Sequence, residues 1–200
     1  MHSIWTEQWW PVAYLRDLDR KCPNRFTLLE RDLVLWWDAE SSSWRAFEDV
    51  CPHRLVPLSE GRINAFGQLE CPYHGWSFDG EGNCKSIPQM QETCSPAGRR
   101  SRCRTLPTVT AQGLLFVWSG DPNAARFDDL PIVPLLQEQE DGWADGWIVQ
   151  DTFRDLPMDA LTLLENVLDV SHVPFTHHRT VGKRENASPV EAVITREDSQ

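Results

Sequence analysis

The sequence predicts an all-β domain of stacked antiparallel sheets followed by the start of an α+β domain. Up to about residue 118 the chain has short candidate strands with frequent turns, including closely spaced glycines from Gly61 to Gly82. Residues 121–147 are rich in proline and acidic residues and show no regular period, which indicates a connection. Residues 156–170 then have a helical period. We therefore expect domains at 1–120 and 148–200, joined by a connection at 121–147.

The individual elements follow from local patterns. Residues 26–37 predict two short strands around a polar turn at 30–32, 41–48 a turn and a strand, and 113–118 a buried strand. Leu161, Leu164 and Leu168 form an apolar stripe on the predicted helix. We expect Pro174 to end or kink this helix near Val173. Residues 191–200 resemble a strand in a domain that is cut short.

Composition excludes some functions. The 200 residues are 40% hydrophobic and include ten tryptophans, which favours a packed core, and the net charge of −11 opposes general attraction to nucleic acid. There is no apolar run of about 18 residues that could span a membrane. The first residues have no secretory or transit-peptide character. We therefore expect a cytoplasmic protein of a bacterium, which could be a cyanobacterium.

Two cysteine–histidine segments form the first candidate metal site. They are Cys51-Pro52-His53 and Cys71-Pro72-Tyr73-His74. Two thiolates on one iron and two imidazoles on the other are the ligands of a Rieske [2Fe–2S] cluster. The proline after each cysteine stiffens its loop, so less entropy is lost when the ligands converge. The sequence therefore predicts a Rieske cluster on these four residues.

The alternative for this site is a single zinc ion bound by two cysteines and two histidines. Zinc fingers group their cysteines and histidines separately, whereas each segment here offers one of each. The other cysteines are not ligands in this interpretation. Cys84 is expected closer to the cluster, and the rest are expected as small core or surface residues: Cys22, Cys94 and Cys103.

A second candidate metal site lies in the predicted helix. Asn166, Asp169, His172 and His177 follow one another at spacings of three, three and five residues. Asp169 and His172 would share a helix face, and the turn at Pro174 would let His177 return to the same ion. Two histidines and a carboxylate form the facial triad of non-haem iron(II) oxygenases. Taken alone, two surface histidines at such a spacing are common, and that interpretation remains open.

The full pattern resembles the Rieske non-haem iron oxygenases, and within them the pheophorbide a oxygenase and chlorophyllide a oxygenase group. The segments that carry the resemblance are Gln8-Trp9-Trp10-Pro11-Val12, residues 51–62, residues 71–78 and Ile87-Pro88-Gln89. Rieske proteins of electron-transport chains typically carry a disulfide at positions that hold Val56 and Tyr73 here. Trp76 stands where those proteins place a serine that hydrogen-bonds the cluster, so we expect a low reduction potential, around −150 mV.

The resemblance implies the roles of individual residues. His172 and His177 would bind a mononuclear iron, Asn166 would lie close to it, and Asp169 would link an iron-bound histidine to a Rieske histidine of a neighbouring subunit. His178 misses the pattern. The third iron ligand, a carboxylate, comes from farther downstream in this family, and Asp198 is too near to serve. The mononuclear site would thus be only partly built in this sequence.

The resemblance also implies partners. We expect reduced ferredoxin or a reductase as electron donor, O2, and a tetrapyrrole-like or other hydrophobic ring substrate. A homotrimer would carry electrons across its interfaces, and any membrane association would lie in a hydrophobic C-terminal region absent from this sequence. Residues 99–104 contain four arginines, which form either a solvated loop or a docking patch for an acidic donor. The alternative functions are an electron-transfer module without oxygenase activity and a zinc-stabilised interaction domain.

Overall fold

The structure is a computed structural model. It describes residues 5–90, 99–134, 136, 138–139, 142–143, 148–150, 152–191 and 193. The chain forms two compact units, Met1–Ile148 and Val149–Gln200, and each is described by itself.

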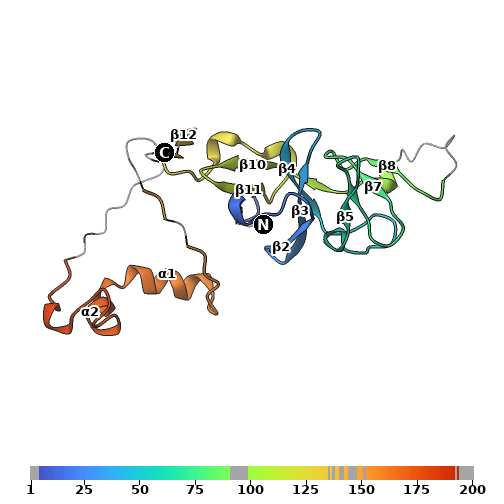
Figure 1. Cartoon of the computed structure of the whole chain (residues 1–200). Coiled ribbons are helices and arrows are strands. Elements are labelled where there is room, and N and C mark those ends of the chain that lie inside the picture. Colours follow the sequence, from blue (N-terminus) through green and yellow to red (C-terminus); the bar gives the residue numbers. More distant parts are fainter. Residues whose placement is uncertain are drawn as a thin grey trace. The chain divides into compact units, whose positions relative to one another are not determined.

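The described part of the first unit contains short strands and single turns of 3-10 helix (Figure 1). The strands are β1 (Trp9–Tyr14), β2 (Asn24–Leu28), β3 (Arg31–Asp38), β4 (Ser43–Glu48), β5 (Arg62–Ile63), β6 (Leu69–Glu70), β7 (Ser77–Phe78), β8 (Cys84–Ser86), β9 (Thr105–Leu106), β10 (Thr108–Ala111), β11 (Leu114–Trp118), β12 (Glu138–Gln139) and β13 (Gly142–Trp143). The 3-10 turns are η1 (Leu15–Asp17), η2 (Leu58–Glu60), η3 (Arg99–Ser101), η4 (Pro122–Ala124) and η5 (Phe127–Asp129).

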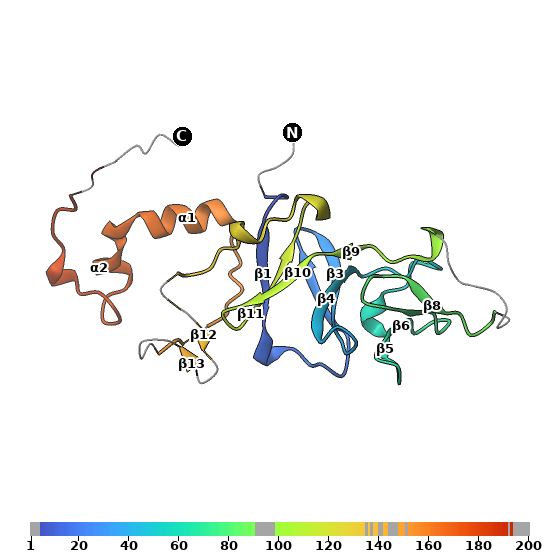
Figure 2. The same ribbon diagram turned by 90° about the horizontal axis from the view of Figure 1, so that it is seen from above.

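These strands pair antiparallel into small sheets, as the sequence predicts. The sheet orders are β1-β11-β10, β2-β3-β4-β9, β5-β6-β7-β8 and the pair β12-β13. The two views agree that the β2-β3-β4-β9 sheet lies between the other two larger sheets (Figures 1 and 2). The predicted strands in 26–37, 41–48 and 113–118 are observed as β2, β3, β4 and β11.

The central sheet is buried on both faces because the side chains of β3 alternate. Leu33 and Leu35 point to a core shared with Leu115 and Val117 of β11. Val34 and Trp36 point to a second core, which contains both cysteines of the first candidate site. Each fully buried side chain of this size contributes roughly 1.5–3 kcal/mol. The four-stranded β5-β6-β7-β8 sheet and its loops are therefore held against a rigid, doubly covered sheet.

The predicted connection begins as a packed segment. Phe127 of η5 stacks on Trp9 of β1, with ring centroids 5.7 Å apart, and the Trp9 indole N–H donates to the carbonyl of Arg126 at 2.7 Å. The Gln112 amide donates to the Val133 carbonyl at 2.8 Å. The first part of the predicted connection, as far as residue 133, therefore packs against the strands of the first unit.

The second unit contains α1 (Ala160–Leu168), η7 (Val170–His172), α2 (Val173–Thr176) and η8 (Arg184–Asn186). The Asp159 carboxylate caps α1 by accepting the Thr162 N–H at 3.0 Å, so the helix is shorter than the predicted 156–170. Pro174 was expected to end or kink this helix near Val173. The helix instead ends at Leu168, and Pro174 lies in the first turn of α2, where a proline costs no hydrogen bond.

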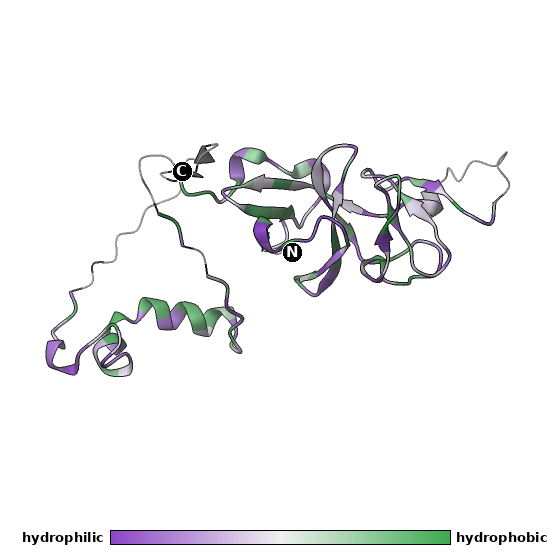
Figure 3. Cartoon of the chain, in the orientation of Figure 1, coloured by the Kyte–Doolittle hydropathy of each residue, from purple (hydrophilic) through white to green (hydrophobic). Residues whose placement is uncertain are grey.

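Most of α1 is hydrophobic, as Figure 3 shows, and its predicted apolar stripe is exposed. No described residue of 149–191 is buried, which contrasts with the first unit. In the part of the chain that the structure describes, no helix is both long and apolar enough to cross a bilayer.

Candidate metal sites

The first cysteine–histidine loop leaves β4 and is closed by two main-chain hydrogen bonds. The Cys51 N–H donates to the Val56 carbonyl at 2.8 Å, and the Leu55 N–H donates to the Cys51 carbonyl at 2.9 Å. Leu55 adopts a left-handed conformation, with φ of +59°. The buried Asp49 carboxylate accepts the Ser59 N–H at 2.7 Å and ties the start of the loop to its end.

The second loop, between β6 and β7, repeats this geometry. The Cys71 N–H donates to the Trp76 carbonyl at 2.8 Å, and the Gly75 N–H donates to the Cys71 carbonyl at 3.1 Å. Gly75 takes the left-handed position with φ of +72°, and a Cβ added there would lie 3.1 Å from Pro88. Both the left-handed conformation and the close approach of Pro88 therefore favour glycine at this position.

The structure places the four predicted Rieske residues on two loops, with the two cysteines in one buried cluster and the two imidazoles near each other. The Cys51 and Cys71 side chains are 1% and 2% exposed, and the imidazole centroids of His53 and His74 lie 4.7 Å apart. Burial raises the pKa of the Cys51 thiol to about 11. The main-chain N–H groups of His53 and Arg54 hydrogen-bond the Cys51 sulfur and favour its thiolate. Burial also lowers the pKa of His53, with the nearby His74 as a second cause, which favours the neutral imidazole.

An iron–sulfur cluster fits this site because two histidine nitrogens, which could bind iron, are buried without a hydrogen-bond partner. The Nδ1 atoms of His53 and His74 are buried and have no hydrogen-bond partner. In the described part of the chain, Trp36 Nε1 is the one other buried side-chain polar atom of this kind. Buried polar atoms are rarely left without a partner, and two nitrogen atoms beside two buried thiols are the donors that iron takes in a Rieske centre.

The second candidate site is assembled from the short elements after α1. The His172 and His177 ring centroids lie 5.2 Å apart, close enough for both imidazoles to face one ion. His178 differs, because its Nδ1 already accepts the Arg184 N–H at 3.2 Å. Among the described residues, no group of three or more histidine, cysteine, aspartate or glutamate side chains is placed to hold a single metal ion, either here or at the first site. Asp198 lies outside the described residues.

Asp169 departs from its expected place on one helix face with His172. It follows the end of α1, and its carboxylate caps η7 by accepting the Ser171 N–H at 3.1 Å. The Ser171 hydrogen bonds lower the pKa of Asp169. The main-chain carbonyl of Asp169 contacts His172 Nδ1. Asn166 lies in the last turn of α1, before this cap.

Several features next to the first site could not be read from the motif. The Trp76 indole stacks on the His53 imidazole, and the Gln89 amide donates to the His74 carbonyl at 3.1 Å. Cys84 and Cys103 belong to the same buried cluster as the ligand cysteines, and burial raises the pKa of both thiols. Cys22 is exposed, as expected of a surface cysteine, and Cys94 lies outside the described residues.

The arginines of the predicted docking patch flank the buried Cys103. Arg102 donates to the Glu81 carbonyl at 3.0 Å, and Arg104 pairs with the Glu48 carboxylate at 3.3 Å. Arg100 is exposed, and the side chain of Arg99 lies outside the description.

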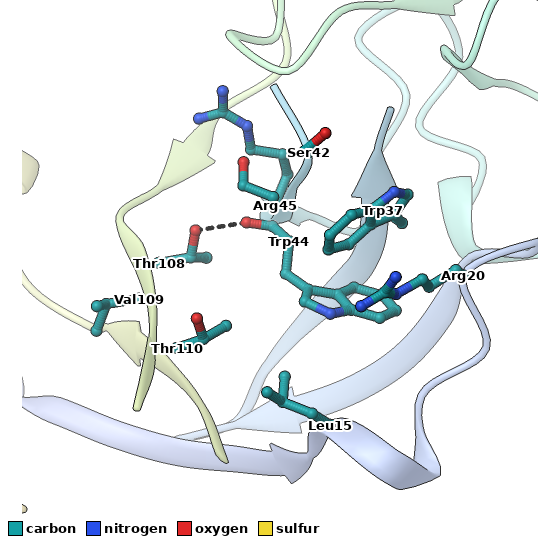
Figure 4. Close-up of a pocket in the computed structure, with 10 residues that line it drawn as sticks. Leu15, Arg20, Trp37, Ser42, Trp44, Arg45, Thr108, Val109 and Thr110 are labelled. Atoms are coloured by element: carbon teal, nitrogen blue, oxygen red, sulfur yellow. Dashed lines mark hydrogen bonds between the residues drawn. The ribbon is translucent and has the colours of Figure 1, made fainter. Parts of the chain in front are cut away.

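A separate pocket of about 360 Å³ is lined by residues of β3, β4 and β10 (Figure 4). Its wall includes Trp37 and Trp44, with the Arg20 guanidinium 4.0 Å above the Trp37 ring. Thr108 Oγ1 donates to the Trp44 carbonyl at 2.7 Å and ties β10 to β4. None of the predicted site residues lines this pocket.

Comparison with known protein families identifies the class. Residues 8–110 match the Rieske [2Fe–2S] domain, and residues 158–200 match the vanillate O-demethylase oxygenase C-terminal domain. The chain therefore belongs to the Rieske [2Fe–2S] domain family. Within it, the chain lies in the group of oxygenases that includes pheophorbide a oxygenase and chlorophyllide a oxygenase.

The individual similarities are extensive. Pheophorbide a oxygenase of Arabidopsis thaliana is 43% identical, and the match covers 93% of this chain and 35% of that protein. Chlorophyllide a oxygenase of the same plant is 31% identical, and the match covers 88% of this chain and 30% of that protein. Among solved structures, NdmA of Pseudomonas putida superposes with a TM-score of 0.71, at 26% identity over 93% of this chain and 54% of that chain. Dicamba monooxygenase superposes with a TM-score of 0.58, at 34% identity over 64% of this chain and 38% of that chain. The chain thus spans about a third of the length of the curated relatives it matches.

The relatives correct the expected location. Three of the relatives similar to this chain are chloroplast proteins: pheophorbide a oxygenase, chlorophyllide a oxygenase and the protein TIC 55. The expectation of a bacterial cytoplasm is therefore wrong. It rested on the first few residues, which carry no information about leaders in a sequence that spans part of its relatives.

Proposed function

We propose that this chain is the electron-receiving part of a chloroplast Rieske oxygenase, with a [2Fe–2S] cluster bound by Cys51 and Cys71 on one iron and by His53 and His74 on the other. The observation that carries the proposal is the pair of buried, unpartnered Nδ1 atoms next to two buried thiols. No group in the described part of the chain satisfies these nitrogens, whereas iron would. When bound, the cluster supplies one-electron transfer at a potential set by its mixed ligands.

The residues around the cluster each have a defined task. The two equivalent loops hold the cysteine sulfurs in the core, where water cannot compete for the metal. The N–H groups of His53 and Arg54 stabilise the Cys51 thiolate. The histidines are only partly exposed, so their outer nitrogens lie nearer to solvent or to a partner than the sulfurs do. Electrons would leave the cluster through the histidine side.

We propose a mononuclear non-haem iron as the acceptor, bound by His172 and His177. The 5.2 Å separation of their rings supports a shared ion, and the hydrogen bond at His178 argues for a different role for that residue. The third ligand would be a carboxylate from outside this sequence. Asn166 would lie close to the iron. Asp169 would link an iron-bound histidine to a Rieske histidine of a neighbouring subunit, where its carboxylate would orient both rings and stabilise the positive charge that moves with the electron.

The substrate class and partners follow from the relatives. Pheophorbide a oxygenase, chlorophyllide a oxygenase and flavonoid 8-hydroxylase 2 are named for hydrophobic ring compounds, so we expect a chlorophyll-derived or similar substrate, with O2 as oxidant. Reduced ferredoxin or a reductase would supply electrons, and a homotrimer would pass them between subunits. The exposed Arg100 and Arg102 offer a basic contact for an acidic donor.

A second function, an electron-transfer module without its own oxygenase activity, is favoured by one observation. All four proposed cluster ligands belong to one unit, with both cysteines in its core and both histidines partly exposed, so no ligand comes from the other unit.

Iron and acid-labile sulfide per chain, with the EPR spectrum of dithionite-reduced protein, test these proposals. A Rieske signal with two irons supports the cluster and the carrier function, whereas a third iron lost on His172→Ala supports the oxygenase. Zinc in place of iron would overturn both.

A further inference from the structure

We propose that Trp76 is a positioning residue of the cluster: its indole ring holds the His53 imidazole in the orientation that directs Nδ1 at the metal. The inference rests on the proposed function in one respect, namely that His53 is an iron ligand.

The geometry of the two rings carries the inference. The centroids of the Trp76 and His53 rings lie 4.5 Å apart, and their planes differ by 7°, which is a parallel stack. The other ring near His53 is His74, at 4.7 Å and tilted by 55°. Rotating the His53 imidazole about its side-chain bonds would break the flat contact with the indole. Trp76 therefore opposes movement of His53 Nδ1 away from its buried position.

Trp76 also joins the two ligand loops. Its main-chain carbonyl accepts the Cys71 N–H at 2.8 Å and closes the second loop, while its ring contacts the histidine of the first loop. The indole packs against the buried cluster that contains Cys51, Cys71 and Phe78. The orientation of His53 is thereby coupled to the core of the domain and to the second loop.

The second histidine has no comparable support in the described part of the chain. The ring nearest to His74 is Tyr73, at 4.0 Å and tilted by 40°, and Tyr73 is 63% exposed. Gln89 contacts the main-chain carbonyl of His74 and leaves the imidazole unconstrained by that bond. The two histidines are thus held by different means, and removal of the indole should affect His53 first.

Replacing Trp76 by phenylalanine or by leucine separates stacking from packing. Both side chains are apolar and fill part of the space, but only phenylalanine can stack on an imidazole. The matched control is Trp37→Leu, because Trp37 is also partly buried but packs on the opposite core, against Trp44 (Figure 4). The full chain is purified anaerobically, and the measurements are the EPR line shape of the reduced protein and the rate of cluster loss in excess EDTA.

We expect W76F and W37L to keep the wild-type line shape and loss rate. W76L should show a broadened signal, since His53 samples several orientations, and should lose the cluster roughly 10-fold faster or more. Equal line shapes and rates for W76L and W76F would overturn the inference. If W76L loses the β-sheet circular dichroism signal, Trp76→Met replaces it under the same criteria, because methionine is flexible enough to fill an irregular gap and cannot stack. A wild-type chain without a Rieske signal would instead defeat the proposed function.

Discussion

The two candidate metal sites of this chain differ in how their ligands are supported. Cys51 and Cys71 lie in a core that two sheets build, and their loops are closed by matching main-chain hydrogen bonds. His172 and His177 lie on short helical turns in a unit whose described residues are all at least partly exposed. The first site is therefore organised by the core of its domain, whereas the second has only the local chain to organise it.

This difference has an energetic meaning. Ordering a loop costs about 1–2 kcal/mol of conformational entropy for each residue, and a folded core has already met that cost for the first site. At the second site, metal binding itself must supply much of the ordering, so iron should be held more weakly. The exposed apolar face of α1 is a further sign that the second unit depends on additional packing.

The largest expected effect comes from removing a buried ligand of the first site. Cys51→Ser should abolish the Rieske EPR signal and the iron bound with it, because a serine hydroxyl is a poor iron ligand and leaves a polar group buried. Cys22→Ser, at an exposed cysteine, should bind wild-type iron. Metal analysis and EPR check both variants. Retention of a normal signal in C51S would show that Cys51 is not a ligand.

At the second site the expected effect is confined to one iron. His172→Ala should remove mononuclear iron and leave the Rieske signal unchanged, because the sites lie in separate units. His178→Ala is the matched control, since the Nδ1 atom of His178 already accepts a main-chain N–H. Iron per chain after equilibration with excess Fe(II) measures the outcome. Loss of the same iron in H178A would contradict the assignment.

The sequence predicted much of the first unit because its signals are local. Strand periodicity predicted β2, β3, β4 and β11. The cysteine–histidine spacing predicted a cluster site, and the structure places the two histidine rings of that motif near each other and both cysteines in one core. The stacking of Trp76 on His53 could not be predicted, because it depends on how two loops approach each other across the core.

The helical region was predicted less well for a physical reason. A leucine stripe indicates that a helix exists but not where it starts and stops. Asp159 caps α1 after the predicted start, and Asp169 caps η7, which separates Asp169 from the helix face expected for it. Capping by aspartate competes with helix continuation, and Pro174 then begins the next helical turn.

A smaller effect is expected from exchanging the left-handed residues of the two equivalent loops. Leu55 and Gly75 occupy corresponding positions, with φ of +59° and +72°. Gly75→Ala should lower the free energy of unfolding by about 1–2 kcal/mol, because alanine is strained there and meets Pro88. Leu55→Gly should be close to neutral, because relief of strain is offset by the greater freedom of glycine in the unfolded chain. Thermal unfolding of both holo-proteins measures this, and equal losses of stability would show that left-handed strain does not decide the two outcomes.

The smallest expected effect concerns the cap of α1 and its pH dependence. Hydrogen bonds from Thr162 lower the pKa of Asp159. A lowered folded-state pKa means that the cap stabilises α1 above the unfolded pKa of about 3.9 and that this contribution is lost as pH falls through the folded value. Asp159→Ala should therefore reduce the helicity of residues 160–168 at neutral pH, whereas Asp159→Asn, which caps without titrating, should retain it at low pH as well. The ¹³Cα chemical shifts of α1 report helicity directly. An acid-induced loss of helicity that is as large in D159N as in the wild type would show that the carboxylate is not the group responsible.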